Sequence, residues 1–137
     1  MAPINSCGST VYEGSTPAEV PGCVSWEWNE EASVEDYVDN TTDCNEAAMI
    51  GPVRRPITIV YNLQDGVAKG KPVWRARDVL DTLQLHIDDT GSNYWEFASA
   101  TVLGFSNHKF DLKTGQPIAI EYTLRPTAAP TPNGTLA

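Results

Sequence analysis

The sequence predicts a mainly β protein: a two-sheet β-sandwich or half-barrel with one short flanking α-helix and flexible N- and C-terminal arms. Two features indicate this class. Four segments after residue 56 carry the alternation, or the β-branched and aromatic residues, typical of strands. Both ends are rich in Pro, Gly and small residues, with too few apolar positions to pack. Because 137 residues fit one domain, we expect an arm over 1–22, a β-sandwich over 23–126 and a C-terminal tail over 127–137.

The four expected strands follow one another along the second half of the chain. Residues 57–63, ITIVYNL, and 82–88, TLQLHID, alternate apolar and polar side chains. Residues 94–106, YWEFASATVLGFS, are expected as one long strand with both faces at least partly covered, and residues 117–126, PIAIEYTLRP, close the core. The side chains expected on the apolar faces of the first, second and fourth strands are Ile57, Ile59, Tyr61, Leu63, Leu83, Leu85, Ile87, Ile118, Ile120, Tyr122 and Leu124.

One segment between these strands has a helical spacing. In PVWRARDVLDTL, residues 72–83, the apolar residues fall near i, i+3, i+4 and i+7, and Pro72 is acceptable in the first turn of a helix. The pattern predicts a short α-helix that packs on the β core, although Leu83 also belongs to the next expected strand.

Charge is the unusual property of the composition. Eighteen acidic and nine basic residues give a formal net charge of −9, which disfavours nucleic acid and anionic membranes as binding partners. Residues 24–47 alone carry eight carboxylates and no Lys or Arg, yet their aromatic and β-branched residues remain typical of a pair of strands. No apolar run is long enough for a membrane span, and the start lacks a secretory pattern, which favours a cytoplasmic origin.

The sequence contains no recognisable motif for catalysis, metal binding or cofactor binding. His86 and His108 lie in no nucleophile–base motif, and no glycine-rich phosphate-binding loop is present. Residues 39–46, DNTTDCNE, are dense in oxygen ligands but lack the central Gly of a calcium-binding EF-hand loop. Cys7, Cys23 and Cys44 show no metal-ligand spacing, and we expect three reduced thiols whose roles the sequence does not assign. The sequence therefore predicts a protein that is not an enzyme and has no metal or cofactor.

Two tryptophans support an alternative function. Trp26 and Trp28 share one face of an expected strand, and a β-sandwich with exposed aromatic rings is one way to bind carbohydrate. Packing in a core or a subunit interface is the more frequent use of such side chains. A carbohydrate-binding module therefore stands as the alternative to a structural protein.

The order of these elements resembles that of small siphophage major tail tube proteins. The resemblance covers about residues 20–128 and rests on the succession GCVSWEWNEEASVEDYVDNTTDC, RRPITIVYNLQDG, PVWRARDVLDTLQLHIDDTG, NYWEFASATVLGFSNHKFDLKTG and QPIAIEYTLRPTAA. It implies the tail-tube β-sandwich, shared with the hemolysin-coregulated proteins of type VI secretion. It also implies hexameric rings that stack into a hollow tube, with sheet edges closed between subunits.

The resemblance implies partners and site residues as well. The expected partners are other copies of this chain, a tape measure protein, a tail terminator and double-stranded DNA that passes without specific binding. The expected location is a virion tail assembled in the host cytoplasm. Because a wall of carboxylates repels phosphates, the candidates for DNA-facing residues in the lumen are Glu30, Glu31, Glu35, Asp36, Asp39 and Asp43. The candidates for contacts between rings are Val38, Asn40, Met49 and Ile50.

Overall fold

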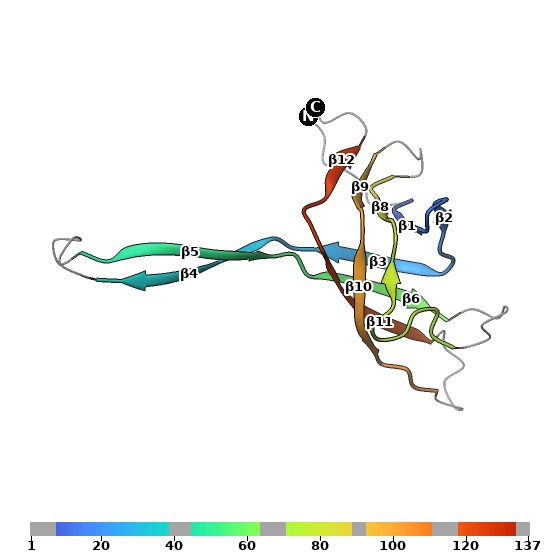
Figure 1. Ribbon diagram of the computed structural model, residues 1–137. Coiled ribbons are helices and arrows are strands. Elements are labelled where there is room, and N and C mark those ends of the chain that lie inside the picture. Colours follow the sequence, from blue (N-terminus) through green and yellow to red (C-terminus); the bar gives the residue numbers. More distant parts are fainter. Residues whose placement is uncertain (1–7, 39–44, 64–70, 89–92, 111–117, 134–137) are drawn as a thin grey trace.

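The computed structural model describes residues 8–38, 45–63, 71–88, 93–110 and 118–133, and these residues form twelve strands (Figure 1). The strands are β1 (Thr10–Glu13), β2 (Ala18–Glu19), β3 (Cys23–Trp28), β4 (Glu31–Tyr37), β5 (Ala47–Arg54), β6 (Ile57–Asn62), β7 (Val79–Leu80), β8 (Leu83–His86), β9 (Tyr94–Phe97), β10 (Ala100–Ser106), β11 (Ala119–Pro126) and β12 (Thr131–Asn133). The expected mainly β class is confirmed.

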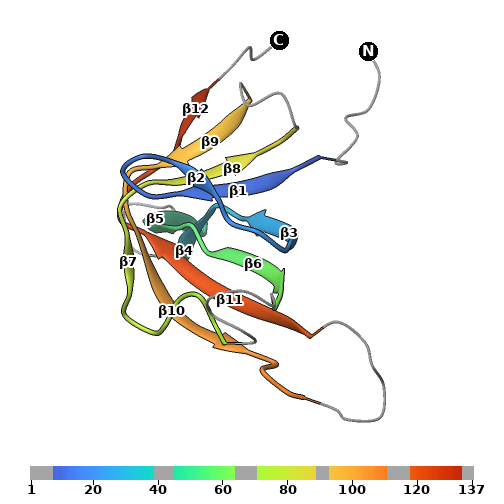
Figure 2. The same cartoon turned by 90° about the vertical axis from the view of Figure 1, so that its right-hand side faces the viewer.

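The strands form two five-stranded sheets and one separate pair. Sheet A has the order β12-β9-β8-β1-β2, and sheet B has the order β3-β6-β11-β10-β7. Strands β4 and β5 pair only with each other. Figure 2 shows sheets A and B as the two layers of the body, which matches the expected two-sheet sandwich.

The alternation in β6 and β11 gives one layer of the core. Ile57 and Ile59 of β6 and Leu124 of β11 are fully or almost fully buried, while the residues between them are only partly covered. Sheet A supplies the facing layer through side chains such as Leu85 and Phe97. These strands and their inward faces agree with the sequence prediction, since burial of one sheet face follows directly from period-two alternation.

The expected helix over residues 72–83 is wrong. This segment is irregular and ends in the two-residue strand β7, which pairs with β10. Arg77 has a left-handed φ of 75°, and its N–H donates to the Val102 carbonyl at 2.8 Å. Val73 and Val79, expected on the apolar face of the helix, are exposed. Pairing with β10, which lies far along the chain, replaces the local helical hydrogen bonds.

The expected long strand over residues 94–106 is two strands in different sheets. Strand β9 ends at Phe97 in sheet A, and β10 begins at Ala100 in sheet B. Phe97 and Ala100 are both fully buried, because the chain turns through the core as it passes from one layer to the other.

The expected arms are also corrected where the structure describes them. Strand β1 lies between β2 and β8, and its Val11 is fully buried in the core. Strand β12 pairs with β9 as the outermost strand of sheet A. The packed body therefore extends into both segments that the sequence predicted to be flexible. Residues 1–7 and 134–137 lie outside the described part of the chain.

A buried tyrosine hydroxyl holds the segment that replaces the helix. The Val73 N–H donates to the Tyr122 hydroxyl oxygen at 2.8 Å, and the Trp74 N–H lies 3.5 Å from the same oxygen. The rings of Tyr122, Trp74 and Tyr61 pack edge to face. In contrast, the Tyr61 hydroxyl is buried and has no hydrogen-bond partner among the described residues. The two tyrosines share one cluster, so they form a matched pair.

We expect Tyr122→Phe to lower the free energy of unfolding by about 1 to 3 kcal/mol, because it leaves backbone N–H groups without their acceptor. Tyr61→Phe removes no acceptor and is expected to leave that free energy unchanged or to raise it. Urea unfolding of the two variants measures the difference. Equal losses in both variants would contradict the role of the Tyr122 hydroxyl.

Candidate functional site

The most distinctive feature of the chain is a long hairpin, β4 and β5, that projects from the body (Figure 1). It continues the β3–β6 pair beyond Trp28 and Ile57, since only two residues separate β3 from β4 and β5 from β6. At this junction the Asn29 N–H donates to the Pro56 carbonyl at 3.1 Å, and Arg55 Nε donates to Glu30 Oε1 at 3.0 Å. All seven residues of β4 are exposed.

The two faces of the hairpin differ in chemistry. Cross-strand partners share a face, as do residues two apart on one strand. The register pairs Val34 with Ile50 and Ala32 with Val53. The apolar face therefore carries Ala32, Val34, Asp36, Ala48, Ile50 and Val53. The opposite face carries Glu31, Ser33, Glu35, Tyr37, Ala47, Met49 and Arg54.

A bulge makes the apolar face continuous. Ile50 and Val53 are three residues apart, a spacing that would place them on opposite faces of a regular strand. The pairing shifts between Ala32 and Val34, so that Gly51 and Pro52 together lie opposite Ser33. A Cβ at Gly51 would meet Ser33 Oγ, so a side chain there would require the Ser33 hydroxyl to move. The bulge therefore brings Val53 onto the face of Ile50.

The apolar side chains of the hairpin face solvent to an unusual degree. Ile50 is 72% exposed, Val34 is 60% exposed and Met49 is 59% exposed. An isolated two-stranded hairpin is at best marginally stable in water, because it has no second layer to cover its apolar face. Exposed apolar surface of this kind marks an interaction site on a soluble protein.

Charge divides the hairpin into two halves. At its base, Arg55 forms an ion pair with Glu30, and Glu31 lies opposite Arg54. Between residues 34 and 53 the sequence contains five acids and no Lys or Arg. The base is therefore nearly neutral, and the outer half is strongly negative.

Most of the sequence-predicted site residues fall on this hairpin. Four of the expected luminal acids, Glu30, Glu31, Glu35 and Asp36, are exposed on or directly before β4. Of the expected inter-ring residues, Val38 follows β4, and Met49 and Ile50 lie on β5. Asp39, Asn40 and Asp43 lie outside the described residues. Val34 and Val53 were missed, although the alternation in residues 31–37 could have indicated Val34.

Trp26 and Trp28 do not form an exposed platform for a sugar. Both pack against the core: Trp26 Nε1 donates to the His86 carbonyl at 3.1 Å, and the Trp28 ring meets Trp95 edge to face at 5.2 Å. Since both rings join sheet B to sheet A, the structure does not support the carbohydrate-binding alternative.

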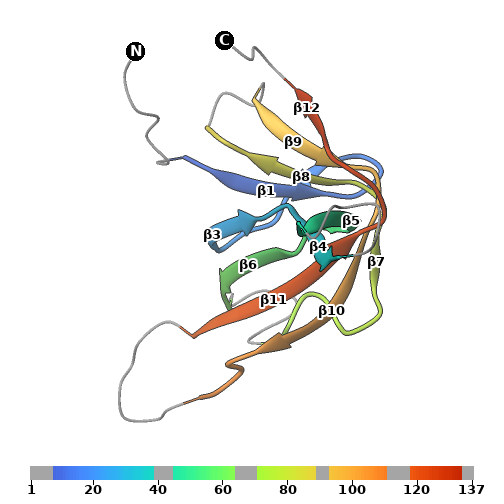
Figure 3. The ribbon, with the colours of Figure 1, turned by 90° about the vertical axis from the view of Figure 1, so that its left-hand side faces the viewer.

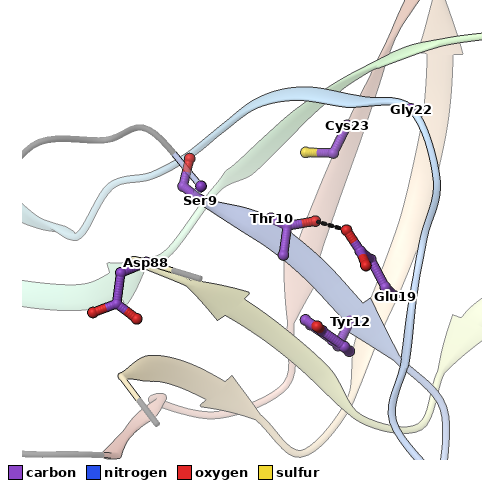
Figure 4. Close-up of a pocket in the computed structure, with 8 residues that line it drawn as sticks. Ser9, Thr10, Tyr12, Glu19, Gly22, Cys23 and Asp88 are labelled. Carbon is purple, nitrogen blue, oxygen red and sulfur yellow. Dashed lines mark hydrogen bonds between the residues drawn. The ribbon is translucent and has the colours of Figure 1, made fainter. Parts of the chain in front are cut away.

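A polar pocket lies between β1, β2 and the start of β3, and Figure 4 shows its lining. Within it Thr10 Oγ1 donates to Glu19 Oε1 at 3.2 Å. Burial, together with the Glu19 carboxylate, raises the pKa of the Cys23 thiol to about 11, although a backbone hydrogen bond at Ser25 acts in the opposite direction. The thiol is therefore protonated at neutral pH and is a poor nucleophile. The described residues contain no cluster of three or more His, Cys, Asp or Glu side chains arranged to hold a metal.

His86 is a buried titratable group beside the rings of Tyr12 and Tyr94. Its ring lies between those of Tyr12 and Tyr94, with centroids 4.2 and 4.7 Å away, and its Nε2 is 3.0 Å from Gln84 Oε1. Its Nδ1 is buried with no partner among the described residues. Burial lowers the pKa of His86 below its ordinary 6.5, although Asp88 and Glu19 act in the opposite direction. The arrangement favours a neutral structural histidine.

We expect the free energy of unfolding to fall as the pH drops below 6.5, because the unfolded chain then binds a proton that folded His86 resists. His86→Phe keeps an aromatic ring between the tyrosines, and we expect it to reduce this dependence. Urea unfolding at several pH values from 7.5 to 5 measures both slopes. Glu13 contributes in the opposite direction, because burial, and then the charge of Asp81, raises its pKa. The parent protein and the variant share this contribution, so it cancels when their slopes are compared. Identical slopes would contradict the assignment.

Among the residues that the structure describes, no helix is long and apolar enough to cross a membrane. No protein-family model matches the sequence, and no curated protein matches it either. Several chains of solved structures do match it.

The chain is similar in structure to chains of several tail-like particles. A chain in the anti-feeding prophage cap, described as its tube terminating cap, matches with a TM-score of 0.67 and 16% identity over 98% of this chain and 93% of that one. A chain in the sheath-tube complex of an extracellular contractile injection system matches with a TM-score of 0.63 and 17% identity, over 97% and 93%. A chain in the virion of a gene transfer agent particle matches with a TM-score of 0.61 and 11% identity, over 95% and 98%.

These identities are low, and the likeness concerns the fold. It extends over nearly the whole length of both chains in each comparison, so the shared architecture is not limited to a single sheet. The narrower expectation of a siphophage tube protein stays a prediction. The chain has a tail-tube-like fold, the fold of chains found in contractile injection systems and gene transfer agent particles.

Proposed function

We propose that this protein is a structural component of a phage-like tail, which self-assembles into stacked hexameric rings and forms a tube through which double-stranded DNA passes without specific binding. The single observation that carries the proposal is the projecting hairpin. Its apolar face is uncovered in the single chain, and Ile50 is 72% exposed. Other copies of the chain would supply the missing second layer.

The sheet edges support the same proposal. Sheet B ends in β3 on one side and in the two-residue strand β7 on the other, and no described strand pairs with their outer edges. Free edges are a liability in a monomer, and a closed ring removes them by placing one subunit beside the next. Ring closure through sheet B would use backbone groups that the single chain leaves available.

The net charge supports passage of DNA without retention. A tube built from chains of net charge −9 repels phosphates, whereas a basic wall would hold DNA by releasing its counterions. Glu30, Glu31, Glu35 and Asp36 remain predicted luminal residues. Their position on a hairpin that leaves the body also suits contacts between rings, together with Val38, Met49 and Ile50.

The proposed partners and location follow from the same assembly. We expect a tape measure protein inside the tube and a terminator at its end, in a tail that is assembled in the host cytoplasm. One of the similar chains lies in a tube terminating cap and another in a sheath-tube complex. The proposal therefore covers two roles for a chain of this fold, that of a tube subunit and that of a terminator.

Electron microscopy of the purified protein at rising protein and salt concentration tests the proposal. Salt screens the repulsion between acidic subunits, so we expect six-fold rings or hollow tubes to increase with both variables. Light scattering follows the same change in solution. A protein that stays monomeric at every concentration and salt level would overturn the proposal.

A further inference from the structure

Exposed arginines also lie on sheet B, from β7 at its edge to the end of β11, which pairs with β6 close to the base of the hairpin. Apart from Arg54 and Arg55 at the hairpin base, the arginines of the chain are Arg75, Arg77 and Arg125. Arg77 is tied to β10 through the Val102 carbonyl, and Arg125 of β11 lies opposite Thr101 of β10. All three are exposed. They follow one sheet edge, formed by β7, β10 and the end of β11.

Apolar side chains lie among these arginines on the outer face of the sheet. Val79, Thr101 and Arg125 form one cross-strand row, and Leu103 lies two residues beyond Thr101 on the same strand. Val79 is 60% exposed and Leu103 is 51% exposed. We name this surface, Arg77, Val79, Leu103 and Arg125, the β7 edge patch.

Two acids lie near the β7 edge patch without covering it. An Asp78 carboxylate oxygen accepts the Arg75 N–H at 2.7 Å, so this acid is engaged within its own turn. Asp81 is close enough to Glu13 of sheet A to raise the pKa of that carboxyl. The β7 edge patch therefore presents Arg125, Val79 and Leu103 on its outward side, and Arg77 is exposed two residues before β7.

The outer half of the hairpin has the complementary composition. Its apolar face presents Val34 and Ile50 beside Asp36, whereas Glu35 lies on the opposite face with Met49. No Lys or Arg occurs between residues 34 and 53 to neutralise these acids. The hairpin points away from the body in Figure 1 and toward the viewer in Figure 3, so its outer half does not reach the β7 edge patch of its own chain.

We propose that the outer half of the hairpin of one copy docks on the β7 edge patch of a second copy. Val34 and Ile50 cover Val79 and Leu103, and in this arrangement Asp36 faces the arginines rather than the lumen. This inference rests on the proposed self-assembly and names its partner surface. Because the two surfaces differ, the contact is head-to-tail, and each copy offers a free hairpin and a free patch to its neighbours. Such a contact continues around a ring or along a stack.

A pair of charge reversals tests the docking. The hairpin variant is Asp36→Lys, and the patch variant is Arg125→Glu. Each variant alone places like charges across the contact, so we expect at least a tenfold higher protein concentration for the onset of light scattering. Mixed in equal amounts, the Lys hairpins meet Glu patches and the native hairpins meet native patches. We expect the mixture to assemble near the concentration of the native protein.

The control is Glu19→Lys, which makes the same change in net charge as the hairpin variant, on an exposed acid of β2 in sheet A. It should assemble as the native protein does. Circular dichroism verifies that each variant is folded before mixing. If the native protein assembles but the mixture does not recover, the docking is wrong and the proposed function stands. If the native protein itself never assembles, the proposed function fails first. Binding of the patch to DNA fragments instead, lost in the patch variant, would also overturn the docking.

Discussion

Removing the projecting hairpin is expected to abolish assembly while the two-sheet body still folds. The change replaces residues 30–55 by a short Gly-rich turn that joins Asn29 to Pro56. No residue of β4 or β5 belongs to the buried core, so the deletion removes no core packing. The β3–β6 pairing remains, with Trp28 opposite Ile57 at its end. The new turn then closes an ordinary two-stranded hairpin.

Two measurements separate the effects on folding and assembly. Thermal unfolding of the shortened chain should stay cooperative, with a midpoint close to that of the dilute native protein. Sedimentation and electron microscopy at high concentration should show monomers only. As a matched control, Glu31→Gln with Arg54→Gln alters the hairpin base without changing net charge and should still assemble. Rings formed by the shortened chain would show that the hairpin is dispensable.

The largest loss of stability is expected from Phe97→Ala. This ring is fully buried between the sheets, and it meets Trp28 of sheet B edge to face at 5.8 Å. It also precedes the corner where the chain passes from sheet A to sheet B. Truncation of a buried Phe costs about 3 to 5 kcal/mol, through lost burial and the cavity that remains. A domain of this size has about 5 to 15 kcal/mol in total, so a large part of the population would unfold on mild warming.

Urea unfolding of dilute protein measures this loss without interference from assembly. Phe97→Leu keeps most of the apolar volume and should lose much less. Val24→Ala removes an exposed apolar side chain from β3 and should change the free energy of unfolding by less than about 0.5 kcal/mol. A loss from Phe97→Ala as small as that from Val24→Ala would contradict the place of Phe97 in the core.

The strands that the sequence predicted well are those whose burial follows from local alternation. In β6 and β11 every second residue is covered by sheet A, so the pattern reports the structure directly. Strand β1 has no comparable signal, because its one buried residue, Val11, is covered through pairing with β8 about seventy residues later. The helical spacing in residues 72–83 gave a wrong prediction for the same reason. The backbone of this segment forms its hydrogen bonds with β10, which is distant in sequence.

The sequence predicted which segment carries the candidate site, but not which of its side chains share a face. The absence of cations indicated residues 24–47 as an extended acidic ribbon, and Met49 and Ile50 were proposed for contacts. What alternation could not give was the bulge at Gly51 and Pro52, which aligns Val53 with Ile50. Alternation also could not predict the β7 edge patch, because Arg77 and Arg125 are far apart in sequence. They lie on one surface only because each of them pairs with β10.

The continuity of β4 with β3 and of β5 with β6 has a mechanical consequence. A pull on the end of the hairpin runs along the strand axes into the middle of sheet B, where β6 pairs with both β3 and β11. The hydrogen bonds of the β6–β11 ladder lie across the direction of pull, so tension loads many of them together in shear instead of opening them one at a time. A string of copies linked through their hairpins would resist stretching with the strength of a whole sheet.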